Sequence, residues 1–111
     1  MNIVDSSGWL EYFTDGMNAE YFHEPLNNSE SLIIPTIIIY EVFKVILRKR
    51  NENEALKSIA LMRQGITVDL TEDIAILAAQ TSIEHNMPMA DSIILATARI
   101  YNATVWTQDE D

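Results

Sequence analysis

Four acidic residues carry the chemistry that this sequence could perform: Asp5, Glu41, Asp91 and Asp109. If they gather in one pocket, each pair of carboxylates about 4 Å apart repels by roughly 4 kcal/mol at an effective dielectric of ~20. Such a pocket must take up protons or bind cations. Because every ligand would be oxygen, Mg²⁺ or Mn²⁺ is favoured over Zn²⁺. These ions lower the pKa of bound water and stabilise charge on a phosphodiester, so the acids predict a metal-dependent phosphodiester hydrolase.

Glu41 and Asp91 are the most informative of the four acids, because their helical neighbours are apolar. Glu41 interrupts the apolar run 37–43, and Ile94 and Leu95 lie one helical turn after Asp91. A carboxylate among apolar groups is costly unless it is paired or binds a metal. Both positions therefore suggest that these carboxylates belong to a metal-binding site.

Each acid also has an ordinary explanation. Glu41 could extend to water or pair with Lys44 or Arg48, and Asp91 could cap a helix. Asp5 could be a turn or capping residue, and the aspartates at the end of the chain could simply be solvated. Their joint placement counts against all of these explanations together, because each acid falls where the predicted fold gathers its ligands.

The predicted elements alternate between strand and helix. A serine at position 6 or 7 is expected to cap the first helix, and Thr71 to cap the fifth. Alternation of this kind favours an α/β fold with a short, mostly parallel central sheet flanked by helices. Ligands of such sheets gather beyond the carboxyl ends of the strands, where Asp5 and Asp109 would lie. The predicted strands are 2–5, 31–34, 66–70 and 104–106, and the predicted helices are 7–13, 16–26, 36–50, 52–64, 72–84 and 90–101.

Length and composition limit the class of protein. A chain of 111 residues, 48% of them apolar, predicts one domain over 1–111 with a real core. The lack of cysteine excludes disulfides and thiolate metal sites and is compatible with a cytoplasmic location. No secretory signal is recognisable. The longest apolar run, 37–43, is too short to span a bilayer, so no membrane association is expected.

The charge distribution leaves two interpretations open. A net charge of −10, from 7 basic and 17 acidic residues, argues against a nucleic-acid binder. However, the cations are concentrated: six fall between positions 44 and 63, and only Arg99 lies elsewhere. This basic stripe could follow a phosphate backbone, or it could be the solvated faces of two helices.

The acids and their flanking residues, in this order, resemble the PIN domain, and specifically the toxin nucleases of VapBC-type toxin–antitoxin pairs. The opening MNIVDSSGWLEYF resembles the first strand, acid and helix of the family. IPTIIIYEVFKVILRK resembles the helix that carries the second acid, and MPMADSIILATAR resembles the third. ATVWTQDED resembles the last strand and its Thr-x-Asp-x-Asp turn. The resemblance covers essentially the whole chain and implies a PIN-like three-layer sandwich.

The resemblance also implies a function. It implies a Mg²⁺- or Mn²⁺-dependent endoribonuclease that cuts RNA, forms a homodimer and is inhibited by a cognate antitoxin protein. Asp5 and Asp91 would be the primary metal ligands, and Glu41 and Asp109 would complete the site directly or through water. The residues implied to support these ligands by hydrogen bonds are Ser6, Thr107 and Asp111.

Family members usually continue beyond the last acidic turn with an aromatic residue and a closing edge strand. This chain stops at Asp111, so that edge strand is expected to be missing. An uncovered edge would hold Asp109 poorly. A PIN-like protein-interaction module with weak or no catalysis is therefore the alternative function.

Three further features of the sequence bear on its function. His23 and His85 have no ligand spacing and are expected to be ordinary surface residues. A receiver-type or phosphatase-type phosphotransfer protein is disfavoured, because Asp5 lacks a second acid two residues later and no lysine follows position 57. Apolar side chains on the N-terminal helices offer either a dimer face, an antitoxin groove or ordinary core packing: Leu10, Tyr12, Phe13, Met17, Tyr21 and Phe22.

Overall fold

The computed structural model describes residues 1–108, in which short strands alternate with helices as predicted. The strands are β1 (Asn2–Val4), β2 (Ile33–Pro35), β3 (Ile66–Val68) and β4 (Thr104–Trp106). The helices are α1 (Ser6–Phe13), α2 (Ala19–Leu26), α3 (Thr36–Lys49), α4 (Glu52–Met62), α5 (Glu72–His85) and α6 (Met89–Tyr101), with a 3₁₀ turn at Ser29–Ser31.

The sheet consists of two parallel strand pairs. Strand β1 pairs with β4, and β2 pairs with β3. A single parallel bridge between Asn2 and Leu32 joins the two pairs, which gives the order β3-β2-β1-β4. All four strands run in the same direction, so their carboxyl ends lie along one edge of the sheet. The prediction of a short parallel sheet is confirmed.

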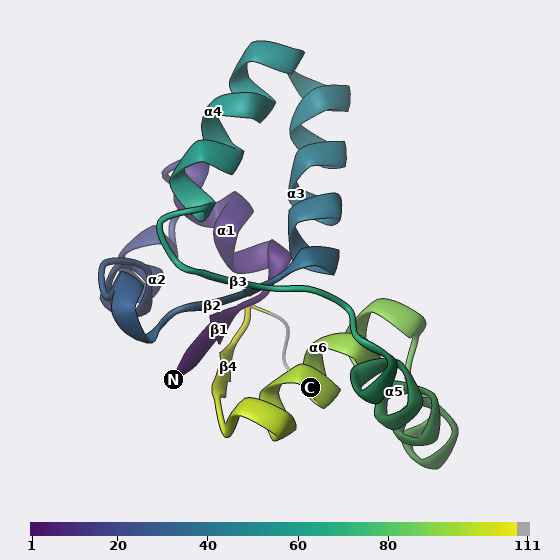
Figure 1. Ribbon diagram of the computed structural model, residues 1–111. Coiled ribbons are helices and arrows are strands. Elements are labelled where there is room, and N and C mark those ends of the chain that lie inside the picture. Colours follow the sequence, from purple (N-terminus) through teal and green to yellow (C-terminus); the bar gives the residue numbers. More distant parts are fainter. Residues whose placement is uncertain (109–111) are drawn as a thin grey trace.

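Helices cover both sides of this sheet, as Figure 1 shows. Helices α1, α3 and α4 lie on one side of the strands, and the paired helices α5 and α6 lie on the other. Helix α2 packs against α1 and β1. The predicted three-layer α/β arrangement is thus confirmed. Within residues 1–108, no helix is long and apolar enough to cross a membrane.

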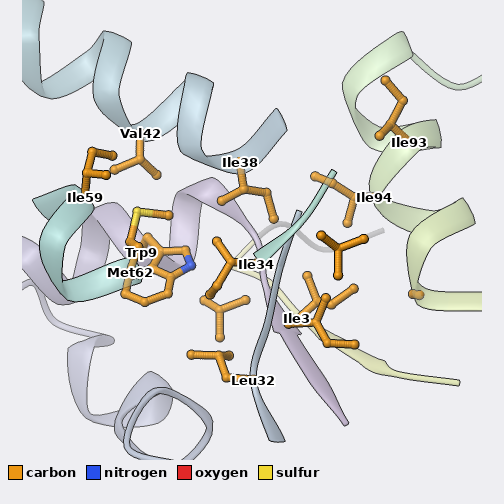
Figure 2. Close-up of a cluster of buried hydrophobic side chains, with 14 of the residues drawn as sticks. Ile3, Trp9, Leu32, Ile34, Ile38, Val42, Ile59, Met62, Ile93 and Ile94 are labelled. Atoms are coloured by element: carbon orange, nitrogen blue, oxygen red, sulfur yellow. The ribbon is translucent and has the colours of Figure 1, made fainter. Parts of the chain in front are cut away.

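The hydrophobic core occupies both interfaces between the helices and the sheet (Figure 2). On one side, Ile38 and Val42 of α3 are fully buried and face the strands. On the opposite side, Ile94 of α6 faces the strands, and Ile93 is buried next to it toward α5. Each buried aliphatic side chain of this kind contributes about 1.5–3 kcal/mol. The core therefore fixes α3 and α6, the two helices that carry Glu41 and Asp91.

The ends of the helices follow capping chemistry, with one correction to the sequence prediction. Helix α1 is capped by Asp5 and not by a serine at position 6 or 7, because the Asp5 side chain accepts the Gly8 N–H. The ordinary explanation of Asp5 as a capping residue is therefore correct. Thr71 caps α5 as predicted, by accepting the Ile74 N–H. Helices α5 and α6 each end in a left-handed asparagine, a conformation that asparagine tolerates well.

The apolar side chains of the N-terminal helices serve partly as core. Phe22 is fully buried, whereas Met17 is 98% exposed and Tyr21 is 56% exposed. Helix α1 approaches β1 and α2 so closely that a Cβ at Gly8 would lie 2.6 Å from Val4 Cγ1 and 2.7 Å from Phe22 Cε1. Only glycine fits at this crossing.

Candidate active site

Asp5 occupies the carboxyl end of β1, at the edge where ligands of parallel sheets gather. Its backbone N–H donates to the Trp106 carbonyl oxygen (3.1 Å), which continues the pairing of β1 with β4. Its Oδ1 accepts hydrogen bonds from Ser7 Oγ (2.7 Å) and the Gly8 N–H (3.1 Å). Its Oδ2 accepts from Thr107 Oγ1 at 2.5 Å, the length of a charge-assisted bond. The Asp5 carboxylate is thereby held in one orientation.

Two hydrogen-bond contacts link the segment after β4 to Asp5, one directly and one through Ser7. Thr107 donates directly to the carboxylate. The Gln108 N–H donates to Ser7 Oγ (3.3 Å), which in turn donates to Asp5. The chain is therefore directed toward Asp5 immediately before position 109.

Glu41 lies half-buried in the second turn of α3. Burial is the main cause that raises the pKa of its carboxyl group above the usual value of 4.5. A hydrogen bond from the Ser6 side chain opposes this by lowering the pKa, and the negative charges of Asp91 and Asp5 raise it again. Glu41 thus interacts electrostatically with two of the other three predicted acids, Asp5 and Asp91, which come from different elements of the fold.

The ordinary explanation of Glu41 as one half of an ion pair does not hold within residues 1–108. Lys44 lies against Tyr40 instead, with Nζ 3.3 Å from the phenol oxygen and 5.4 Å from the ring centroid. Neither Lys44 nor Arg48 forms an ion pair with Glu41. Among the described residues, Glu41 therefore has no ion-pair partner.

Asp91 is an exposed residue in the first turn of α6. Pro88 occupies the N-cap position of this helix and no side chain caps it, so the ordinary explanation of Asp91 as the cap is wrong. Asp91 and Asp5 line one cleft of about 420 Å³, which we call the α6 cleft. Its lining residues are Asp5, His85, Met87, Asp91, Ile94, Leu95, Arg99 and Val105.

A second cleft, of about 410 Å³, opens between α1 and α3. We call it the α1–α3 cleft. It reaches the site through Ser7 and Gln108, the residues that link Asp5 to the segment after β4. Its lining residues are Ser7, Leu10, Glu11, Thr14, Val45, Ile46, Lys49, Arg50 and Gln108.

The structure brings together Asp5, Glu41 and Asp91 electrostatically, with Ser6 and Thr107 hydrogen-bonded to two of them. Asp109 and Asp111 lie outside the described residues. Within residues 1–108, no three His, Cys, Asp or Glu side chains approach closely enough to enclose a metal ion by themselves. The donor set nevertheless fits a hard divalent cation in its chemistry, since it is all oxygen and its charge repulsion is uncompensated.

Sequence reasoning missed three residues of this region. Ser7 was considered only as a helix cap, yet it donates to Asp5. His85 is exposed as expected, but it lines the α6 cleft together with Arg99. The position of Arg99 on the same helix as Asp91 was the available signal. His85 gave none, because its place depends on how α5 packs against α6.

Comparison with known proteins identifies a family and several solved structures of similar fold. The family model described as the PIN domain matches residues 3–111. A toxin–antitoxin complex from Klebsiella pneumoniae contains a chain with a TM-score of 0.81 and 21% identity, covering 98% of this chain and 87% of that one. VapC20 from Mycobacterium tuberculosis, described as a sarcin–ricin loop cleaving toxin, gives a TM-score of 0.82 at 16% identity and covers 100% of this chain and 92% of that one.

A third structure extends the same pattern. VapBC2 from Rickettsia felis, bound to a DNA fragment from its promoter, gives a TM-score of 0.75 at 13% identity and covers 97% of this chain and 87% of that one. A comparison with curated protein sequences gave no match. At these identities, the structural similarities establish the fold.

Proposed function

Since the chain belongs to the PIN-domain family, we propose that it is a Mg²⁺- or Mn²⁺-dependent endoribonuclease that hydrolyses RNA phosphodiesters. One observation carries the proposal. Glu41 is a half-buried carboxyl group whose pKa is raised by burial and by the charges of Asp91 and Asp5. Three acids from α3, α6 and the end of β1 thus share one electrostatic environment. Such convergence costs stability and is typical of functional sites.

Asp5, Glu41 and Asp91 would hold the metal, with Asp109 as the fourth acid of the proposed site. When bound, the cation would lower the pKa of water and stabilise negative charge on the phosphodiester. The protein contributes orientation. Ser7, Gly8 and Thr107 fix both oxygens of Asp5. Such supporting hydrogen bonds typically change metal affinity or activity by about 10- to 100-fold.

Ser6 has a separate role in the proposed site. Its side chain hydrogen-bonds to the Glu41 carboxyl group and lowers its pKa, against the effect of burial. This bond favours the ionised form of Glu41, which is the form that binds a cation. Asp111 is proposed to assist in the same region of the chain.

We further propose that the protein is the toxin of a VapBC-type pair, acts in the cytoplasm as a homodimer and is inhibited by a cognate antitoxin. The support is the similarity in fold to a chain of a toxin–antitoxin complex, to a toxin that cleaves the sarcin–ricin loop, and to VapBC2. The domain is proposed to extend over residues 1–111.

The test is cleavage of a panel of RNAs with Mg²⁺, with Mn²⁺ and with chelator. Asp5→Asn and Asp91→Asn are expected to lower kcat/KM by about 10²–10³-fold, because each removes a charge that stabilises the metal and through it the transition state. Asp69→Asn is the matched control, since Asp69 is exposed and lines neither the α6 cleft nor the α1–α3 cleft. Cleavage that persists in chelator, or in both variants, contradicts the proposal.

One observation favours a second function, a PIN-like protein-interaction module with weak or no catalysis. Among residues 1–108, no three metal-binding side chains enclose a metal position. Under that alternative, the purified chain binds a protein partner but cleaves no RNA with either metal. Calorimetric titration with Mg²⁺ separates the two functions, because the nuclease requires binding that Asp5→Asn and Asp91→Asn weaken.

A further inference from the structure

Two clefts open on either side of Asp5. The α6 cleft includes the Asp5 and Asp91 side chains in its wall. The α1–α3 cleft includes Ser7, whose hydroxyl donates to Asp5 Oδ1 at 2.7 Å. The two clefts are therefore connected by this hydrogen bond, since Asp5 lines one of them and its donor Ser7 lines the other.

Each cleft carries positive charge on a helix that also carries one of the acids. Arg99 lines the α6 cleft and stands eight residues after Asp91 on α6, about 12 Å along the helix. Lys49 lines the α1–α3 cleft and stands eight residues after Glu41, again about 12 Å along α3. Arg50 lies beside it. The acidic site thus has cations on both sides, and the α1–α3 cleft combines two cations with one carboxylate, that of Glu11.

These cations are available to a ligand. Within residues 1–108, Arg99, Lys49 and Arg50 are exposed and none of them forms an ion pair with a carboxylate. Arg99 makes one long hydrogen bond, from Nη1 to Thr81 Oγ1 at 3.4 Å, which leaves other N–H donors of the guanidinium unused. Although the chain has a net charge of −10, these three cations have no carboxylate partner among the described residues and so offer positive charge to an anionic ligand.

The remaining walls of both clefts are mainly apolar. Leu95 and Val105 contribute to the α6 cleft, and Leu10 and Val45 contribute to the α1–α3 cleft. Single-stranded nucleic acids bind where cations follow the backbone and apolar surfaces receive unstacked bases. The two clefts likewise combine cationic and apolar side chains, as a binding site for a single-stranded nucleic acid requires.

We propose that one single strand of RNA lies in both clefts at once, with Arg99 binding a phosphate on one side of the carboxylates and Lys49 and Arg50 binding phosphates on the other. This inference rests on the proposed function and adds to it the path of the substrate. The strand crosses Asp5 between the two sets of cations, so its scissile phosphate lies over the acids.

A purely structural role for these cations predicts something different. Arg99 and Lys49 lie in the last turns of their helices, where positive charge interacts favourably with the helix dipole. If that is their whole function, their substitution changes thermal stability and leaves the affinity for RNA unchanged. The experiment therefore measures both quantities on the same variants.

The test is fluorescence anisotropy of a labelled single-stranded RNA oligonucleotide, in Ca²⁺ and in chelator, over a range of salt concentrations. Arg99→Gln and the double variant Lys49→Gln/Arg50→Gln are compared, per charge removed, with Arg63→Gln, which removes one positive charge from an exposed position that lines neither cleft. Each lost phosphate contact is expected to weaken binding roughly three- to tenfold and to reduce the salt slope by about 0.7.

The outcomes are separable from those of the proposed function. Weaker binding of Arg99→Gln and of the double variant, with Arg63→Gln like the wild type, supports the path. Equal losses in all three variants, or in none, overturn it even if the wild type cleaves RNA. No binding of RNA by the wild type also overturns it and leaves the clefts to a polypeptide ligand. If binding of RNA depends on Arg99, Lys49 and Arg50 but no metal-dependent cleavage occurs, the path is supported and the nuclease proposal is contradicted.

Discussion

The two faces of α3 differ in what their side chains contribute to the protein: one face packs in the core, and the other carries a predicted site residue. Ile38 and Val42 point into the core and are fully buried between α3, the sheet and α4 (Figure 2). Glu41 lies between them in sequence but faces the acidic edge, where burial and two neighbouring acids raise the pKa of its carboxyl group. The apolar face stabilises the fold, whereas the acidic residue is maintained against an electrostatic cost.

This difference separates stability from activity along a single element. Residues that only pack should lower the free energy of unfolding when they are truncated. Substitution of a residue that is kept for function should instead raise the free energy of unfolding, because functional sites commonly retain groups that destabilise the folded state. Each of the following substitutions tests one side of this comparison.

The largest effect is expected from Ile38→Ala. It removes a fully buried side chain and leaves a cavity beneath α3, which should lower the free energy of unfolding by about 2–5 kcal/mol. Urea denaturation measures this change. Ile83→Ala is the matched control, because Ile83 is 87% exposed on α5 and its loss should change stability by less than about 0.5 kcal/mol. Similar losses for both variants would contradict the described core.

Glu41→Gln is expected to stabilise the metal-free protein at neutral pH. The pKa of Glu41 is raised in the folded state, so that state binds its proton more tightly than the unfolded chain does. The stability of the wild type therefore falls as pH rises from the ordinary value of 4.5 through the raised pKa, and the deficit persists above it.

Thermal unfolding in chelator as a function of pH measures this effect. The variant should have the higher Tm at neutral pH, and its advantage should vanish below pH 4.5, where Glu41 is neutral in both states. Glu24→Gln, on an exposed position of α2, is the control and should show no such pH dependence. A lower Tm for Glu41→Gln at neutral pH would mean that the carboxylate is stabilised rather than strained.

The smallest change is expected from Ser6→Ala. The Ser6 hydrogen bond lowers the pKa of Glu41, so its removal should raise that pKa further and destabilise the ionised form by about 0.5–1.5 kcal/mol. An NMR titration of the Glu41 carboxyl carbon measures the shift directly. Ser29→Ala, far from the acids in sequence and on the 3₁₀ turn, should leave the titration unchanged. A downward shift in Ser6→Ala would contradict the assigned bond.

The fold was predictable because its signals are local. Short apolar runs alternate with amphipathic segments, and the observed strands and helices agree with the predicted ones to within a few residues. The least accurate start was that of α2, predicted at 16 but observed at Ala19, because a turn with Asp15 at φ 53° precedes it. Turn conformations of this kind leave little trace in hydrophobic periodicity.

The candidate site was predictable only in part. The convergence of the acids followed from the rule for parallel strands, and the grouping of Asp5, Glu41 and Asp91 agrees with it. The contribution of Arg99 and His85 to the α6 cleft depends on how α5 and α6 sit against the sheet, which no short-range pattern encodes. Asp109 and Asp111 stay predictions from the sequence.

The close crossing at Gly8 makes the acidic edge sensitive to a residue that has no functional group of its own. The absence of a side chain at position 8 allows α1 to pack closely against Val4 and Phe22, and the backbone N–H of the same residue donates to Asp5. A single added methyl group would displace the helix and this donor together. Random mutagenesis should therefore identify Gly8 as intolerant, although no reaction step would ever involve its side chain.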